Sequence, residues 1–317
     1  MELGIERPSF LTLSTSMWDG QIDARHLYSA LRLTVRTYER DGSTSKTAGL
    51  GTGFAIRGDL LGTSHKGYLV TNRHVLDPNF REMTGRQVDQ VTVEGHRQGS
   101  SPLGEPDDMR FTIKQPEVHF PDRNPDGSWA DVALIDLDTA EVSEGSADVT
   151  RLPTPRLAGF RNFPRLSVGA QVLIPGYPGI DQVVAHRPIL VSGTVASDPR
   201  FDAEIGAEKF IESVLCHSFS WAGMSGSPVF AMLPKQVRTW GDVESGNSRE
   251  LYLVGVNAGH ITIGGSAEGA LTYFVKSTVL IALLRKAGAQ GLGLEMPEPD
   301  YERSALEYEE VELGDGE

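Results

Sequence analysis

The chain has 317 residues, of which 39% are hydrophobic, so it is long enough to bury a sizeable core and does not belong to the disordered class. Its formal charge of −14 and its lack of a basic stripe exclude a nucleic-acid-binding surface, because phosphate binding depends on clustered Lys and Arg. The apolar runs fall far short of the roughly 18 residues of a membrane span, and the single cysteine, Cys216, excludes an internal disulfide.

Residues 1–30 are predicted to form an N-terminal extension, with a short helix near residues 22–31. The first residues lack a basic start followed by an apolar stretch, so no secretion signal is expected. Together with the single cysteine, this pattern favours a cytoplasmic location, because disulfide frameworks are typical of secreted proteins.

Short β-branched or alternating runs begin at about residue 31, and Gly, Pro, Asp and Asn separate them. Leu31, Leu33 and Val35, for example, alternate with polar residues, which is the pattern of a half-buried strand. The first predicted lobe covers residues 31–138, and its strands are 31–36, 53–56, 68–72, 90–94, 111–114 and 131–137.

A segment rich in Pro, Ser, Gly and Asp, residues 139–165, is predicted to link this lobe to a second one over residues 166–276. The strands predicted there are 171–174, 189–195, 210–217, 228–231, 252–257 and 271–275. A C-terminal helix is predicted over residues 277–288, with Ser277 as a cap and Gly288 as its stop. Two sets of six strands with almost no helix predict an all-β fold: two six-stranded antiparallel β-barrels, the active site in the cleft between them, and a C-terminal helix.

The last residues, 289–317, are predicted to form an acidic, solvated tail. From Glu295 to Glu317 ten acidic residues face one base, Arg303, and account for nine of the fourteen net negative charges. Its interspersed apolar residues leave open a second interpretation, in which the tail docks a regulatory partner.

Three motifs carry chemistry. In Gly223-Met224-Ser225-Gly226-Ser227-Pro228 the glycines place a serine on a tight turn whose backbone N–H groups stay open. In Leu69-Val70-Thr71-Asn72-Arg73-His74 an apolar strand delivers a histidine, the base that a serine nucleophile needs near neutral pH. In Trp129-Ala130-Asp131-Val132 an acid opens an apolar strand, where its carboxylate can orient that histidine. Asp136 and Asp138 are alternatives for the orienting acid.

These motifs, with Gly51-Thr52-Gly53-Phe54, resemble the signatures of trypsin-like serine peptidases of the chymotrypsin fold. The order His, Asp, Ser is the chymotrypsin order and differs from that of α/β-hydrolases and subtilisins. The resemblance spans about residues 30 to 287 and is closest to bacterial stand-alone members, the glutamyl endopeptidases and the HtrA protease domain. It implies a serine endopeptidase with Ser225 as nucleophile, His74 as general base and Asp131 as the orienting acid.

The same resemblance implies an oxyanion hole made by the backbone N–H groups of Gly223 and Ser225. Met224 stands where many animal digestive relatives carry an aspartate that pairs with a newly cut N-terminus, so that activating salt bridge is not available. The residues implied for the specificity pocket are Phe219 at its base and, along one wall, Asn257, Ala258, Gly259 and His260. Because Phe219 supplies no acid and Asn257 replaces the histidine of glutamyl endopeptidases, we expect a small or medium uncharged residue before the cut.

Two other functions use the same residues: a catalytically silent protease-fold binding module, and an esterase or acyltransferase. No cofactor and no metal are expected, since the histidines and the cysteine do not have metal-ligand spacing. The expected partner is a polypeptide substrate, with no nucleic acid and no membrane.

Overall fold

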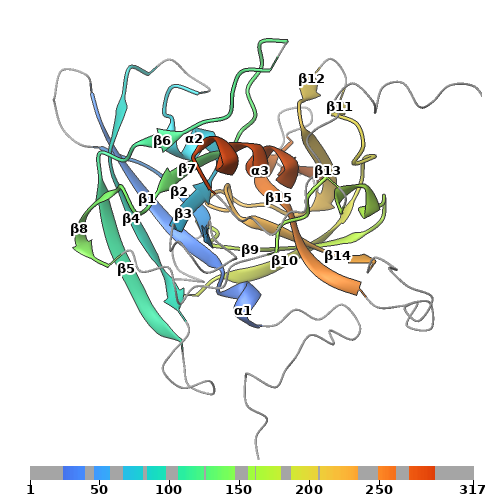
Figure 1. The fold of residues 1–317 in the computed structure, drawn as a ribbon, viewed down its shortest axis with the longest axis horizontal. Coiled ribbons are helices and arrows are strands. Elements are labelled where there is room, and N and C mark those ends of the chain that lie inside the picture. Colours follow the sequence, from blue (N-terminus) through green and yellow to red (C-terminus); the bar gives the residue numbers. More distant parts are fainter. Residues whose placement is uncertain are drawn as a thin grey trace, which may run out of the picture.

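The fold is built almost entirely from antiparallel β-strands, arranged in two large sheets and one small hairpin (Figure 1). In Figure 1 the first sheet lies on the left, the second on the right, and the C-terminal helix crosses between them. The computed structural model describes residues 24–39, 46–57, 67–80, 84–97, 106–124, 126–146, 156–160, 162–179, 187–205, 208–234, 249–261 and 271–289.

The first sheet has eight strands in the order β6-β7-β3-β2-β1-β4-β5-β8. Alternation explains its inner face: Leu31, Leu33 and Val35 of β1 are buried, whereas Arg32 and Thr34 lie on the other face. The bounds of the strands are β1 Ala30–Tyr38, β2 Lys46–Arg57, β3 Gly67–Thr71, β4 Gln87–Arg97, β5 Asp107–Lys114, β6 Val118–His119, β7 Ala133–Asp136 and β8 Glu141–Gly145.

The second sheet is a closed six-stranded barrel in the order β10-β13-β16-β15-β14-β9. Its strands are β9 Gln171–Gly176, β10 Ile189–Val195, β13 Ser213–Ser218, β14 Pro228–Pro234, β15 Arg249–His260 and β16 Leu271–Lys276, and a separate hairpin is formed by β11 Ala203–Ile205 and β12 Glu208–Phe210. Inside the barrel Cys216 is a free, buried thiol whose Sγ lies 2.9 Å from the Thr272 hydroxyl. Burial raises the pKa of this thiol to about 11, so it stays protonated at neutral pH.

The expected pair of six-stranded barrels is therefore confirmed for the second lobe only. The first lobe is an open sheet with two more strands than predicted, β6 and β8. β8 lies inside the segment expected to be a linker, residues 139–165. Its side chains are mostly exposed and carry no apolar alternation, so its pairing with β5 depends on backbone hydrogen bonds that the sequence pattern does not reveal.

The C-terminal helix α3, Ser277–Lys286, packs against both lobes. Leu280, Leu283 and Leu284 are buried in a core cluster that also contains Tyr68 of the first sheet and Val256 of the barrel. Burying each such leucine contributes about 1.5–3 kcal/mol to folding, so the helix fixes the position of one lobe relative to the other. Gly288 follows with φ of 86°, the left-handed conformation of a helix stop.

Two further sequence predictions concern the ends of the chain. Where a short helix was expected near residues 22–31, the structure has the four-residue helix α1, Ala24–Leu27, and β1 begins at Ala30. The rest of the N-terminal extension and the acidic tail from residue 290 lie outside the described residues. Within the described part of the chain, no helix is long and apolar enough to cross a membrane.

Candidate active site

His74 and Asp131 lie in direct contact. His74 is the second residue of the one-turn helix α2, Arg73–Leu76, which follows β3 directly. Its Nδ1 is 2.7 Å from Oδ2 of Asp131, and its backbone N–H donates to Oδ1 of the same carboxylate at 3.0 Å. The Asn72 amide adds a hydrogen bond to the Asp131 carbonyl at 2.6 Å. One carboxylate oxygen therefore holds the imidazole and the other holds the backbone of His74, with Nδ1 toward the acid and Nε2 turned to the opposite side.

Of the two alternative acids, Asp136 has another partner. Asp136 is buried in β7, and its carboxylate accepts a hydrogen bond from the backbone N–H of Asp138 at 2.9 Å. Burial, with a smaller contribution from the charges of Asp136 and Asp138, raises the pKa of Tyr68 to about 12. The negative charges of Asp136 and Asp138 therefore contribute to the raised pKa of Tyr68.

Arg73, next to the histidine, is enclosed by aromatic rings. Its guanidinium carbon lies 4.3 Å from the ring centroid of Trp129, 4.6 Å from that of Phe120 and 5.0 Å from that of Phe80. Its Nε pairs with Asp77 at 3.0 Å. Because Trp129 stands two residues before Asp131, this cation–π cluster joins the helix of His74 to the segment that carries the acid.

Ser225 lies at the junction of the two lobes. Its carbonyl oxygen accepts a hydrogen bond from the Thr52 N–H at 2.8 Å. A Cβ built on the neighbouring Gly51 would lie 3.5 Å from this oxygen and 2.8 Å from Val75, the residue after His74. The serine turn and the helix of His74 therefore both lie against the backbone of Gly51.

Two N–H groups of the serine turn have no acceptor in the part of the chain that the structure describes. The N–H groups of Met224, Gly226 and Ser227 donate to backbone carbonyls at 2.8–3.1 Å. Among the described residues, the N–H groups of Gly223 and Ser225 donate to no protein acceptor. These two groups are the ones that can bind an anionic oxygen.

The direction of the Gly223 N–H follows from its peptide plane. The Ala222 carbonyl accepts a hydrogen bond from the Gly179 N–H at 2.6 Å, and in a trans peptide the following N–H points the opposite way. Gly223 has φ of 89°, and the carbonyl of Trp221, two residues before it, accepts a hydrogen bond from the Met224 N–H at 3.0 Å. Residues 221–224 therefore form a type II turn with glycine at its third position.

Residues 51–234, more than half of the chain, match the family model described as trypsin-like peptidase domain. The chain belongs to this family. A peptidase domain acts on a polypeptide, so the expected polypeptide substrate follows.

Among solved structures, this peptidase domain is similar to the active form of the Rv3671c protease from M. tuberculosis, at 17% identity and a TM-score of 0.44, covering 84% of this chain and 83% of that chain. An inactive form of the Rv3671c protease is similar at 16% identity and a TM-score of 0.43, covering 84% and 92% of the respective chains. A comparison with curated proteins finds no match.

The residues expected to form the specificity pocket lie in different surroundings. Phe219, expected at the base, is 64% exposed and stacks on Trp221 with ring centroids 6.4 Å apart. Asn257 and Ala258 are buried, whereas His260 is exposed. A register shift in the pairing of β15 with β16 after Asn257 changes the side-chain alternation, which the sequence does not reveal.

Two residues that touch the serine turn have a role that sequence reasoning did not give them: Thr52 was not singled out as a site residue, and Asn257 was named for the pocket. The Thr52 hydroxyl donates to the Gly223 carbonyl at 2.7 Å and accepts from the Tyr177 N–H at 3.1 Å. The Asn257 amide, predicted as pocket wall, instead donates to the Met224 carbonyl at 2.9 Å. The only sequence signal for Thr52 was its position between two glycines in the motif Gly51-Thr52-Gly53.

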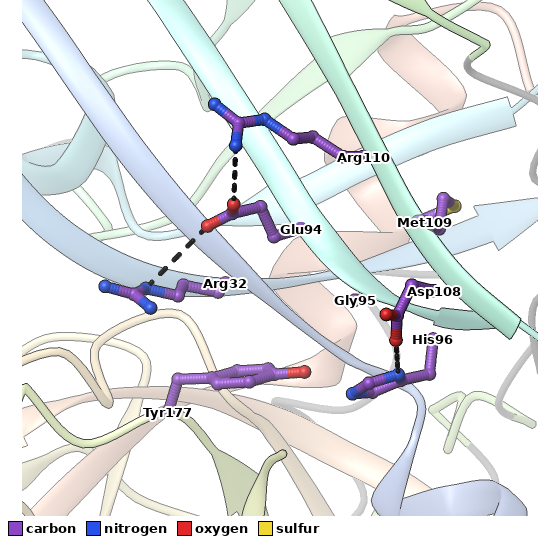
Figure 2. A pocket seen from close by; sticks show the side chains of 8 residues that line it. All are labelled: Arg32, Glu94, Gly95, His96, Asp108, Met109, Arg110 and Tyr177. Atoms are coloured by element: carbon purple, nitrogen blue, oxygen red, sulfur yellow. Dashed lines mark ion pairs between the residues drawn. The ribbon is translucent and has the colours of Figure 1, made fainter. Parts of the chain in front are cut away.

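A separate cavity of about 330 Å³ lies between the first sheet and Tyr177, which follows β9 (Figure 2). Figure 2 shows an ion-pair ladder across three strands, in which Glu94 lies between Arg32 and Arg110. Such cross-strand pairs stabilise a sheet face. Tyr177 is buried, its hydroxyl has no hydrogen-bond partner among the described residues, and burial raises its pKa well above the ordinary range.

Within the described ranges, no group of three or more His, Cys, Asp or Glu side chains is arranged to hold a metal ion.

Proposed function

We propose that the chain is a serine endopeptidase in which Ser225 is the nucleophile, His74 the general base and acid, and Asp131 the residue that orients the histidine. The observation that carries the proposal is that the Asp131 carboxylate contacts both Nδ1 of the His74 imidazole, at 2.7 Å, and the backbone N–H of His74, at 3.0 Å. His74 lies beside the serine turn, in which the N–H groups of Gly223 and Ser225 have no acceptor among the described residues. This arrangement supports an acyl-transfer mechanism.

In this mechanism the Ser225 hydroxyl attacks the scissile carbonyl carbon while Nε2 of His74 takes its proton. Asp131 accepts the Nδ1 proton in a hydrogen bond and stabilises the imidazolium. The oxygen of the tetrahedral intermediate receives hydrogen bonds from the N–H groups of Gly223 and Ser225. Collapse breaks the C–N bond, and His74 returns the proton to the leaving amine. Water, activated by the same imidazole, then hydrolyses the acyl-enzyme.

The preferred substrate has a small or medium uncharged residue before the cut, and the subtype is that of bacterial stand-alone enzymes near the glutamyl endopeptidases and HtrA protease domains. The exposed Phe219 and Trp221 offer an apolar surface and no acid that would select Lys or Arg. Asn257 carries no charge that would select Glu, and its amide already donates hydrogen bonds within the protein. Strong cleavage after Lys or Arg in a peptide library would contradict this specificity.

The function is tested by peptide hydrolysis with two serine variants of the same turn. Ser225→Ala should lower hydrolysis on the order of a millionfold and leave folding intact. Ser227→Ala is the matched control, because this buried hydroxyl has no partner among the described residues and is not used in the mechanism. It should keep its activity.

The alternatives give different results in the same assay. A binding module would leave wild-type protein folded but unable to cleave any peptide of the library. An esterase or acyltransferase would process activated esters and leave peptides intact. Equal hydrolysis by wild-type protein and Ser225→Ala would remove Ser225 from the mechanism.

A further inference from the structure

We propose that Thr52 and Asn257 are positioning residues that hold the oxyanion turn, Ala222–Gly226, in the form that binds the anionic oxygen. The inference rests on the proposed peptidase function and adds to it the groups that fix the two donors. Neither residue touches the substrate in the mechanism above; each acts through a backbone carbonyl of the turn.

Every carbonyl of the turn from Ala222 to Ser225 accepts a hydrogen bond from the protein. Because the N–H of a trans peptide points away from its C=O, holding a carbonyl also fixes the direction of the next N–H. The donors, in the order of the four carbonyls, are Gly179 N–H, Thr52 hydroxyl, Asn257 amide with Ser227 N–H, and Thr52 N–H. The turn is therefore held on its carbonyl side, which leaves its two free N–H groups to a ligand.

Thr52 comes from the first lobe and is completely buried. Its hydroxyl donates to the Gly223 carbonyl at 2.7 Å, and the Tyr177 N–H occupies its acceptor side at 3.1 Å, so its orientation is fixed. Its own N–H holds the Ser225 carbonyl at 2.8 Å. One residue of the first lobe thus fixes two carbonyls of a turn that belongs to the second.

Asn257 is also completely buried and acts on the peptide that carries the Ser225 N–H. Its Nδ2 donates to the Met224 carbonyl at 2.9 Å and to the Ser220 hydroxyl at 3.2 Å. The orientation of the amide is determined, because a carbonyl oxygen can only accept. Its Oδ1 is buried without a partner among the described residues, which costs stability. A polar side chain kept at such a cost is better explained by positioning than by stabilisation.

The two side chains that hold the turn, Thr52 and Asn257, are uncharged. Met224, at the place of the aspartate in animal digestive relatives, is an apolar side chain with no exposed surface. A turn held by a hydroxyl and an amide does not depend on the ammonium group of a new N-terminus. The turn is therefore held by uncharged groups of the folded chain itself.

The test compares Thr52→Val, Thr52→Ser and Asn257→Leu in the full chain. Thr52→Val keeps the shape and removes the hydroxyl, so kcat should fall about tenfold to a hundredfold with little change in KM. Affinity for a peptide aldehyde, whose hemiacetal oxygen enters the oxyanion hole, should fall in parallel. Thr52→Ser keeps the hydroxyl and should restore most of kcat.

Asn257→Leu provides an independent arm, because it replaces the amide by an apolar group of similar size and also removes the unpartnered oxygen. Its unfolding midpoint should stay close to that of the wild type while kcat falls. Thr92→Val is the matched control: Thr92 is buried on β4, away from the turn, and its hydroxyl lies 3.3 Å from that of Thr112.

The outcomes separate the two proposals. If the wild type is active and both Thr52→Val and Asn257→Leu keep the same kcat, the positioning role is overturned and the peptidase function stands. An equal loss of kcat in Thr92→Val would also overturn it, since the effect would then reflect stability alone. A folded wild-type protein without peptidase activity would contradict the proposed function itself. If Thr52→Val does not fold, Asn257→Leu decides the question.

Discussion

Replacement of Gly223 by alanine separates the conformation of the oxyanion turn from the stability of the fold. The residue has φ of 89°, and a Cβ built on it would lie 2.7 Å from the Tyr177 carbonyl oxygen and 2.8 Å from the Gly179 nitrogen. Both are backbone atoms, which cannot rotate out of the way as a side chain could. The added methyl group therefore forces the turn itself to move.

The cost has two parts. A positive φ destabilises a non-glycine residue by about 1–2 kcal/mol. Relief of the overlap requires rotation of the Ala222–Gly223 peptide, which breaks the 2.6 Å hydrogen bond from Gly179 and adds about 1 kcal/mol. The same rotation turns the Gly223 N–H away from the oxyanion, and loss of one such donor lowers kcat by about 10²–10³.

Gly169→Ala is the matched control. Gly169 has φ of 81°, but a Cβ there meets no atom within 4 Å. This variant should lose about 1–2 kcal/mol of unfolding free energy and keep its activity. Urea unfolding and kcat/KM, measured on both variants, give the comparison. Peptide hydrolysis by Gly223→Ala as fast as that by Gly169→Ala would refute the assignment of the oxyanion turn.

Two further predictions concern the surroundings of the site. Arg73→Lys should lower the free energy of unfolding by about 1–2 kcal/mol, because an ammonium group cannot stack on Trp129 as a planar guanidinium does. It should also lower kcat more than it changes KM, through displacement of His74; urea unfolding and steady-state kinetics test both effects, and an unchanged kcat would limit Arg73 to stability. Tyr177→Phe removes a buried hydroxyl that has no partner among the described residues, so the free energy of unfolding should stay the same or rise by about 1 kcal/mol. A clear fall in the free energy of unfolding, measured with urea, would show that the hydroxyl has a hydrogen-bond partner in solution.

The sequence was sufficient for the family and for most strands. Four short motifs predicted a trypsin-like peptidase, and the family match over residues 51–234 confirms it. Motifs of this kind are readable because glycine, serine and histidine at fixed offsets impose local backbone geometry. The contact of His74 with Asp131 has the same basis, since His74 follows one predicted strand and Asp131 opens another; β3 and β7 are hydrogen-bonded neighbours.

The parts that the sequence did not reveal depend on contacts between distant segments. β8 was missed because its exposed polar residues resemble a loop, and its pairing with β5 is made by the backbone. Asn257 was predicted to line a pocket; the hydrogen bond of its amide to the Met224 carbonyl joins residues 33 positions apart. Thr52 meets Gly223 across 171 positions of sequence, a distance over which no local pattern carries information.

The most direct test of the central claim is the reaction of the folded chain with a fluorophosphonate, followed by mass mapping of the adduct. A serine activated by His74 in a formed oxyanion hole predicts one adduct per chain, located on Ser225 and lost in His74→Ala. Absence of labelling under conditions that label a control protease, or an adduct on another serine, would contradict the account.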